Sequence, residues 1–240
     1  MMRSETTHRL IKNPKISARF LADFMAGSET AKRTIVRDCK YLSTARVIQH
    51  DEAKAAIATF MLNHTDPASL EAAASRLRSR IADSDFDRDL YDHNAEYISQ
   101  FAKVHPGIAL PAADILPAEK CPALTLRGVA VTMEINFRLR RLTRTNKVCI
   151  GAGMLRYAKG KSLAAASAEW QSAFLLGYLE REPREEEVPE RKLCLTIDAF
   201  SGSAYGAPSD SIRRFKNMES ACETIAERWP NVKPPPGAIL

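Results

Sequence analysis

The feature that most constrains the fold of this chain is a run of twelve residues, 129–140, in which apolar side chains alternate with small or polar ones. The apolar positions are Val129, Val131, Met133, Ile135, Phe137 and Leu139. Because successive side chains of a strand point to opposite faces, this period of two predicts a β-strand with one buried face. A polar turn over 141–147 and a second apolar run over 147–157 then predict a central antiparallel hairpin.

The rest of the chain shows mostly the apolar spacing of three and four residues that is typical of amphipathic helices. Helices are expected at about 16–25, 29–42, 53–61, 66–81 and 86–104, before a connector that contains several prolines. After the hairpin we expect a helix over 162–181 and a strand over 192–200 with a short return strand. A last helix should carry Phe215 and Trp229 on its apolar stripe and bury them against the sheet. The predicted fold class is therefore α+β, with a helical half over 1–105, a small and mostly antiparallel sheet flanked by helices over 121–229, and an extended Pro-rich tail over 230–240.

Composition excludes several broad classes of protein. Of the 240 residues, 45% are hydrophobic and 27% are charged, which is ordinary for a globular protein and argues against disorder of the whole chain. The N-terminus has no apolar core of a signal peptide, and the longest apolar stretch, near 170–179, is far shorter than the ~20 residues that cross a membrane. No membrane partner is therefore expected. The five cysteines are scattered and form no C-x-x-C pair, so we expect free thiols and a cytoplasmic location.

The positive charge is concentrated in two zones. The net charge is +6, yet residues 1–50 hold ten Lys/Arg against four Asp/Glu, and residues 127–161 hold nine against Glu134 alone. Two such zones indicate an anionic partner, with nucleic acid as the first choice. A solvated surface of mixed charge accounts for the same total. The acidic stretch 83–96 offers another possibility, a protein adaptor that meets a basic partner.

The hairpin is the predicted nucleic-acid surface. Its candidate binding residues are Arg138, Arg140, Arg141, Arg144, Lys147, Arg156, Lys159 and Lys161. A two-stranded ribbon can approach the phosphates of nucleic acid, and guanidinium groups bind phosphates through two parallel hydrogen bonds. A sheet with one wet face carries the same alternation, so a purely structural interpretation stays open. Residues 16–42 also resemble a helix-turn-helix motif, although Gly27 and Lys32 occupy positions that should be apolar and two helices packed on a core explain the same spacing.

The predicted order of helix 86–104, strands, helix 162–181 and strand 192–200 resembles the αβββαβ core of restriction-endonuclease-like nucleases, the RecB family included. Gln171 and Tyr178 are similar to the Gln/Tyr helix of RecB-like members. The resemblance implies an acidic residue on one strand and an acid-x-Lys on the next, which hold a divalent metal and position water. Residues 151–159 of the second hairpin strand contain no acid. If the chain is an enzyme, its candidate catalytic residues are Glu134, Asp198 and Lys159, whose spacing departs from the family's pattern.

Other chemistry is not indicated by the sequence. It contains no G-x-x-x-x-G-K-[ST] loop, no dinucleotide fingerprint and no H-E-x-x-H pair, so no cofactor and no metal site are expected, and Mg²⁺ is implied only by the nuclease alternative. We therefore expect a non-catalytic binding protein, associated with nucleic acid through residues 127–161. The alternatives are a divergent metal-dependent nuclease and a protein–protein adaptor.

Overall fold

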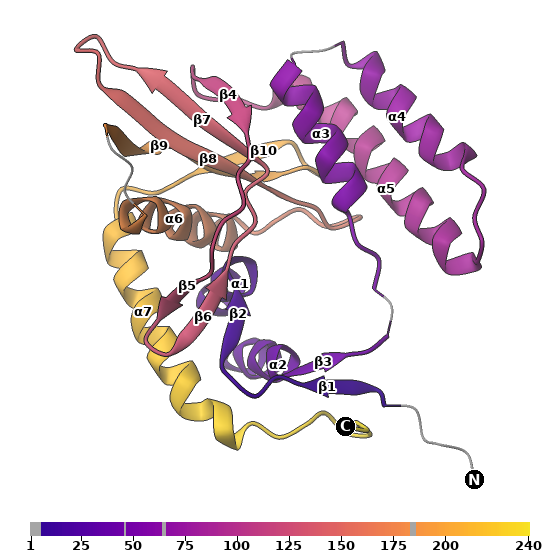
Figure 1. The fold of residues 1–240 in the computed structure, drawn as a ribbon, viewed down its shortest axis with the longest axis vertical. Helices are drawn as coiled ribbons and strands as arrows, with labels where there is room; N and C mark the ends of the chain where they lie inside the picture. The colour runs from indigo at the N-terminus through magenta and orange to yellow at the C-terminus, as the bar shows by residue number, and fades with distance from the viewer. Residues whose placement is uncertain (1–5, 46, 64–65, 183–185) are drawn as a thin grey trace.

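A mixed five-stranded sheet forms the centre of the protein in a computed structural model that describes residues 6–45, 47–63, 66–182 and 186–240 (Figure 1). Its strands are β4 (Asp114–Pro117), β7 (Phe137–Leu142), β8 (Val148–Arg156), β9 (Glu187–Asp198) and β10 (Ser203–Gly206). The strand order is β10-β9-β8-β7-β4, and every neighbouring pair is antiparallel except β8 and β9. Helix α6 (Ala165–Arg181) connects these two parallel strands, as a parallel connection requires. The fold class is thus mixed α and β, as the sequence predicts at this coarse level.

The prediction of one continuous strand over 129–140 is wrong. This run is divided between β6 (Val129–Thr132), which belongs to a three-stranded sheet with β2 (Lys15–Ser17) and β5 (Leu124–Leu126), and β7 of the central sheet. The alternation continues through the break because both halves bury one face, but in different cores: Val131 packs in one hydrophobic cluster and Phe137 in the other. Arg127, at the start of the predicted basic region, lies in the tight turn between β5 and β6 with a φ of 45°.

The helical interpretation of the N-terminal half is incomplete. Its helices are α1 (Ala18–Ala26), α2 (Glu29–Lys40), α3 (Asp51–Asn63), α4 (Ala68–Ser79) and α5 (Asp85–Val104). Serines cap three of them, because the Ser17, Ser28 and Ser84 hydroxyls accept bonds from backbone N–H groups of the first turn. The same half also contains β2 and the pair β1 (His8–Leu10) and β3 (Tyr41–Ser43), whose three-residue lengths are too short for a periodic pattern.

The two faces of the central sheet are covered by different helices (Figure 1). Helices α3, α4 and α5 pack on one face with Phe137, Leu139 and Leu195, and α6 packs on the other face with Ala152 and Met154. The hydrophobic cluster around α6 also includes residues of α1, α2, the three-stranded sheet and α7 (Ser211–Arg228). Both clusters combine residues from before and after the connector at 106–120. No helix within the described ranges has both the length and the apolar character needed to cross a membrane.

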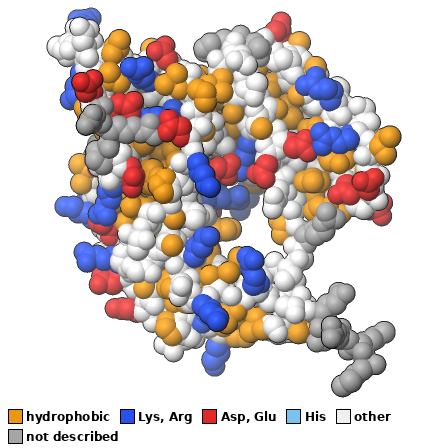
Figure 2. All heavy atoms as spheres, viewed as in Figure 1, with side chains coloured by type: hydrophobic (Ala, Val, Ile, Leu, Met, Phe, Trp, Pro, Cys, Tyr) orange, Lys and Arg blue, Asp and Glu red, His pale blue; other side chains and the backbone are white. Residues whose placement is uncertain are grey.

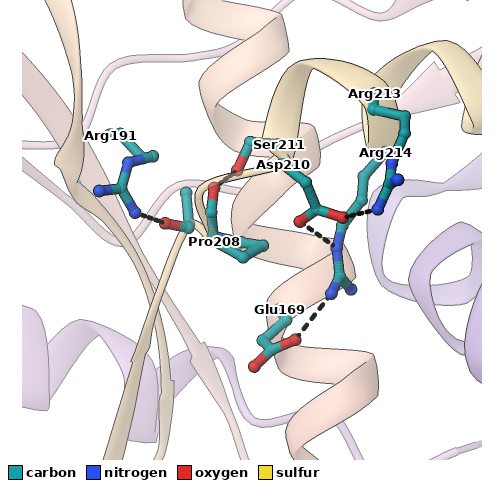
Figure 3. Close-up of polar contacts among 8 residues, drawn as sticks. Glu169, Arg191, Pro208, Asp210, Ser211, Arg213 and Arg214 are labelled. Atoms are coloured by element: carbon teal, nitrogen blue, oxygen red, sulfur yellow. Dashed lines mark hydrogen bonds and ion pairs between the residues drawn. The ribbon is translucent and has the colours of Figure 1, made fainter.

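Helix α7 buries its apolar stripe on α6 and not directly on the central sheet. Phe215 is 6% exposed, its ring centroid lies 5.7 Å from that of Phe174, and it covers Gly177. At the start of α7, the Arg214 guanidinium bonds Asp210 and the carboxylate of Glu169 on α6, at 2.9 and 3.0 Å (Figure 3). These contacts fix the first turn of α7 against α6.

The other end of α7 is held by a buried lysine. The Lys40 ammonium, at the end of α2, donates to the carbonyls of Trp229, Pro230 and Val232 at 2.6, 3.1 and 3.0 Å. The last carbonyls of a helix have no partner within the helix and favour a positive charge. Residues 229–231 form a short 3-10 helix, η2 (Trp229–Asn231), and Trp229 is buried there as the sequence predicts. The N-terminal helices are thereby joined to the end of α7.

Candidate functional site

Most of the candidate nucleic-acid residues lie at two opposite ends of β8. Arg140, Arg141, Arg144 and Lys147 lie at or near the β7–β8 turn, Arg156, Lys159 and Lys161 lie at the far end of β8, and Arg138 lies opposite Ala152 in the middle of β8. The nine residues of β8, at about 3.4 Å each, separate the two groups by roughly 27 Å. The fold therefore divides the basic region 127–161 into distinct surfaces.

Four of these eight cations are paired with acidic side chains. Arg138, whose side chain is 10% exposed, bonds Glu119 and Glu187 at 2.9 and 3.1 Å. Arg141 bonds Glu190 through both its Nε and Nη2 atoms. The remaining two pairs are Arg156 with Asp23 at 2.9 Å and Lys159 with Glu96 at 2.7 Å. The partners Glu187 and Glu190 come from β9, two strands away from β7 in the sheet, so the fold neutralises much of the charge counted along the sequence.

The turn between β7 and β8 keeps an uncompensated positive charge. Arg140, Arg144 and Lys147 are exposed and form no ion pair within the described part of the chain. The turn is ordered by backbone bonds from Thr143 to Lys147 and from Asn146 to Thr143, at 2.9 and 3.0 Å. It projects beyond the helices at the edge of the molecule (Figure 1). We call Arg140, Arg144 and Lys147 the hairpin tip.

A cavity of about 270 Å³ lies at the opposite end of β8. Polar side chains from six parts of the chain line it, namely Arg19, His50, Tyr97, Asn136, Arg156 and Gln171. Figure 2 shows a hollow between the α3–α5 layer and the part of the molecule that carries α1 and α2, with Lys and Arg side chains on its walls. A second cavity, also of about 270 Å³, shares Arg19 and Arg156 with the first.

Arg156 organises the boundary between these two cavities. Its guanidinium bonds the Asp23 carboxylate at 2.9 Å and the Gln171 amide oxygen at 2.9 Å, so helices α1 and α6 both orient it. Burial, together with the nearby charge of Arg156, lowers the pKa of Arg19. Arg19 has no ion pair within the residues that the structure describes. A cation that is repelled by its neighbour and lacks a carboxylate partner favours an anionic group in this position.

Two buried polar atoms in the first cavity have no hydrogen-bond partner within the described residues. They are the Tyr97 hydroxyl and His50 Nδ1. The Tyr97 ring stacks on Tyr157 with centroids 4.2 Å apart, and His50 lies edge-on to Tyr97 at 5.4 Å. Burial raises the pKa of Tyr97 and lowers that of His50, to which the charge of Lys54 also contributes, so both groups are neutral near pH 7. Unpaired buried groups of this kind are normally satisfied by water or a ligand.

The candidate catalytic residues do not line one common cavity: Glu134 lines the first cavity, Asp198 the second, and Lys159 neither. Glu134 bonds Lys54 at 2.7 Å and lines the first cavity. Asp198 is 1% exposed and accepts bonds from Leu163 N, Phe200 N and Ser201 Oγ at 2.8, 3.0 and 2.6 Å, so it closes a turn. Lys159 lines neither cavity and faces Glu96. Within the described ranges no three His, Cys, Asp or Glu side chains are grouped so as to hold a metal ion.

Sequence reasoning missed Arg19, His50 and Tyr97. All three lie in the N-terminal half, and their spacing of 31 and 47 residues carries no motif. Tyr97 falls on the apolar face of α5, where an aromatic residue is ordinarily a core residue. Only the convergence of α1, α3 and α5 at the end of β8 distinguishes these side chains from their neighbours.

The comparisons with known proteins do not add a candidate. No protein-family model matches the chain, and no curated protein matches it. Function is therefore inferred from the residues and their geometry.

Proposed function

We propose that this protein binds nucleic acid without cleaving it, and that the hairpin tip is its principal contact surface. The observation that carries the proposal is the contrast within one basic segment. Arg138 and Arg141 are paired with glutamates, whereas Arg140 near the end of β7 and Arg144 and Lys147 at the ordered turn are exposed and have no ion pair among the described residues. Unpaired cations at a projecting edge can reach phosphates without first breaking internal salt bridges.

The shape of the tip supports nucleic acid over a small anion. A two-stranded ribbon fits the width of a major groove, and three cations around one turn can contact successive phosphates. Leu142, 65% exposed between these cations, adds an apolar group that is able to contact bases or sugars. The paired residues Arg138 and Arg141 hold β7 to β9 and so keep the turn in position.

The nuclease alternative is supported by chain order but not by the donor atoms. Without β5 and β6, which belong to the three-stranded sheet, the succession α5, β4, β7, β8, α6, β9 is similar to the helix–three strands–helix–strand order of the restriction-endonuclease-like core. The cavity at the end of β8 does include two carboxylates, Asp51 and Glu134, but Glu134 pairs with Lys54. Mg²⁺ prefers several carboxylate oxygens and water, and no three His, Cys, Asp or Glu side chains among the described residues are grouped to hold a metal ion. This supports binding without cleavage.

The acidic stretch 83–96 supplies no separate argument for a protein adaptor. Asp85 and Asp87 lie in the first turn of α5, where negative charge stabilises the helix dipole, and Glu96 pairs with Lys159. A basic protein partner therefore has no observation in its favour beyond the charge itself.

The test is a titration of labelled single-stranded and duplex oligonucleotides, measured by fluorescence anisotropy between about 50 and 200 mM salt. We expect binding by the wild type that weakens steeply with salt. The variant Arg140→Ser/Arg144→Ser/Lys147→Ser should lose about tenfold or more in affinity and lower the slope of log K against log salt by about 3, roughly one per phosphate contact. Arg76→Ser/Lys103→Ser/Lys216→Ser removes the same charge from exposed positions elsewhere and should bind nearly as the wild type does.

Two outcomes would contradict the proposal. One is the absence of binding to any DNA or RNA, and the other is an equal loss in the tip variant and its matched control. Incubation with Mg²⁺ or Mn²⁺ separates binder from enzyme, because we expect no cleavage and no thermal stabilisation, whereas an ion at a hundred times its dissociation constant adds about 2.7 kcal/mol. Cleavage that disappears in both Glu134→Gln and Asp198→Asn would establish the nuclease alternative.

A further inference from the structure

A third cavity, far from the hairpin tip, combines an apolar floor with a cationic rim. Its volume is about 420 Å³, within the range of roughly 300–1,000 Å³ that is typical of small-molecule sites. It lies between the end of α1, the first turns of α2, the last turn of α7 and the residues that follow α7. No motif in the sequence marks it, because its walls come from opposite ends of the chain.

The floor of this cavity is apolar and fixed in place. Phe24, Val36 and Ile225 line it while being 8%, 7% and 1% exposed, and all three belong to the hydrophobic cluster around α6 and α7. Val232 adds a fourth apolar side chain, beside the carbonyls that Lys40 holds. An apolar floor favours binding of a hydrocarbon group, and it offers no hydrogen bonds to replace the water molecules of a hydrated ion.

The rim carries five basic residues, and no acidic residue is among the described side chains that line the cavity. The five are Lys32, Arg33, Arg37, Arg228 and Lys233. Among the residues that the structure describes, Lys32 and Arg37 pair only with exposed neighbours on their own helix, Glu29 at 2.8 Å and Asp38 at 3.1 Å. Such exposed pairs contribute little and exchange readily for a ligand's charge. Arg33 and Arg228 have no ion pair within the described ranges.

The boundary between floor and rim is defined by one contact. The Lys32 ammonium lies 5.6 Å from the centre of the Phe24 ring, so the charged group stands at the edge of the apolar surface. The same cavity wall includes Thr30 and Thr34 on the first turns of α2, whose N-terminus also favours negative charge. A ligand with its apolar body on the floor would place an anionic head among these cations.

We propose that this cavity binds an amphipathic organic anion, specifically a medium- or long-chain carboxylate whose hydrocarbon chain covers Phe24, Val36 and Ile225 and whose carboxylate pairs with Arg33 and Arg228. The apolar floor disfavours inorganic anions, and the five cations disfavour neutral hydrocarbons. A nucleic-acid strand satisfies the rim but leaves the floor uncovered. The ligand class is therefore set by the combination of the two surfaces.

Isothermal titration of the full chain with octanoate, decanoate and dodecanoate, below the concentrations at which they form micelles, tests this proposal. We expect one site per chain, affinity that rises by about fourfold for each added methylene, and binding of decanol that is about tenfold or more weaker than that of decanoate. Arg33→Ser/Arg228→Ser should weaken decanoate by about tenfold, because both residues are exposed and their loss leaves the floor intact. Lys216→Ser, an exposed position on α7 outside the cavity, should leave it unchanged.

Several results would overturn the inference. They are no binding of any chain length, equal binding of decanol and decanoate, or equal affinity of the Arg33→Ser/Arg228→Ser variant and the wild type. Displacement of decanoate by an oligonucleotide would instead identify the rim as part of a polyanion surface. The hairpin-tip variant should bind decanoate as the wild type does, so failure here and failure of the nucleic-acid proposal are distinguishable.

Discussion

Gly177, in the middle of α6, lies directly beneath the ring of Phe215 on α7. A Cβ at this position would be 2.1 Å from Phe215 Cδ2, closer than any real contact. The ring is 6% exposed and is confined by Phe174 and by the Arg181 guanidinium, 5.2 Å from its centre. Glycine in a helix interior ordinarily costs about 1 kcal/mol relative to alanine. Gly177 thus lowers the helix propensity of α6 but allows α6 and α7 to pack closely.

The sign of Gly177→Ala should therefore depend on the residue at position 215. In the wild type, a gain of about 1 kcal/mol in propensity is opposed by an overpacking cost of about 1–3 kcal/mol, which leaves the variant between unchanged and about 2 kcal/mol less stable. Phe215→Ala alone should cost about 3–5 kcal/mol. In the Phe215→Ala background the clash is gone, so Gly177→Ala should then stabilise by up to about 1 kcal/mol. The coupling free energy between the two sites is expected to be about 1–3 kcal/mol.

Urea unfolding of the four proteins, followed by far-UV circular dichroism, measures this cycle. The unfolding slope should be the same for all four if each unfolds in one step. A wild-type background in which Gly177→Ala is stabilising would refute the argument. So would a coupling below about 0.5 kcal/mol, the level at which independent sites are additive.

Two further predictions concern titratable side chains. Burial, and to a lesser extent the charge of Lys54, lowers the pKa of His50 from its ordinary 6.5. Neutral His50 therefore contributes its full stabilisation of the folded state above pH 6.5, and this stabilisation is lost as the pH falls from 6.5 toward the lowered pKa. His50→Gln should flatten this part of the stability curve in urea unfolding between about pH 5 and 8, and an unchanged curve would contradict it. Burial also raises the pKa of three thiols to about 12, those of Cys39, Cys194 and Cys222. In native protein Cys121, which is partly exposed, should be alkylated first, and equal rates for all thiols would count against this structure.

The local elements were determined by the sequence itself. The apolar stripes of α5 and α7 give a helical period that the structure confirms. Such a period is a property of one segment, and burial of one face is enough to produce it. Helix α6 and strands β8 and β9 are also found where an element of that type is predicted, but they are buried on nearly all sides in the core, and β9 begins at Glu187 instead of the predicted 192. The short strands β1, β2 and β3 contain three residues each and show no period to detect.

The partners of those elements were decided only by the tertiary structure. The alternation over 129–140 indicates correctly that one face is buried, but not that its two halves bury that face in different cores. The charge count over 127–161 likewise does not show which cations form ion pairs. Glu187 and Glu190 lie on β9, two strands away, and neutralise Arg138 and Arg141. Arg19, His50 and Tyr97 meet at one cavity only because α1, α3 and α5 converge there. The sequence gives the side chain at each position, whereas electrostatic interactions and packing depend on distances between side chains, which only the folded chain determines.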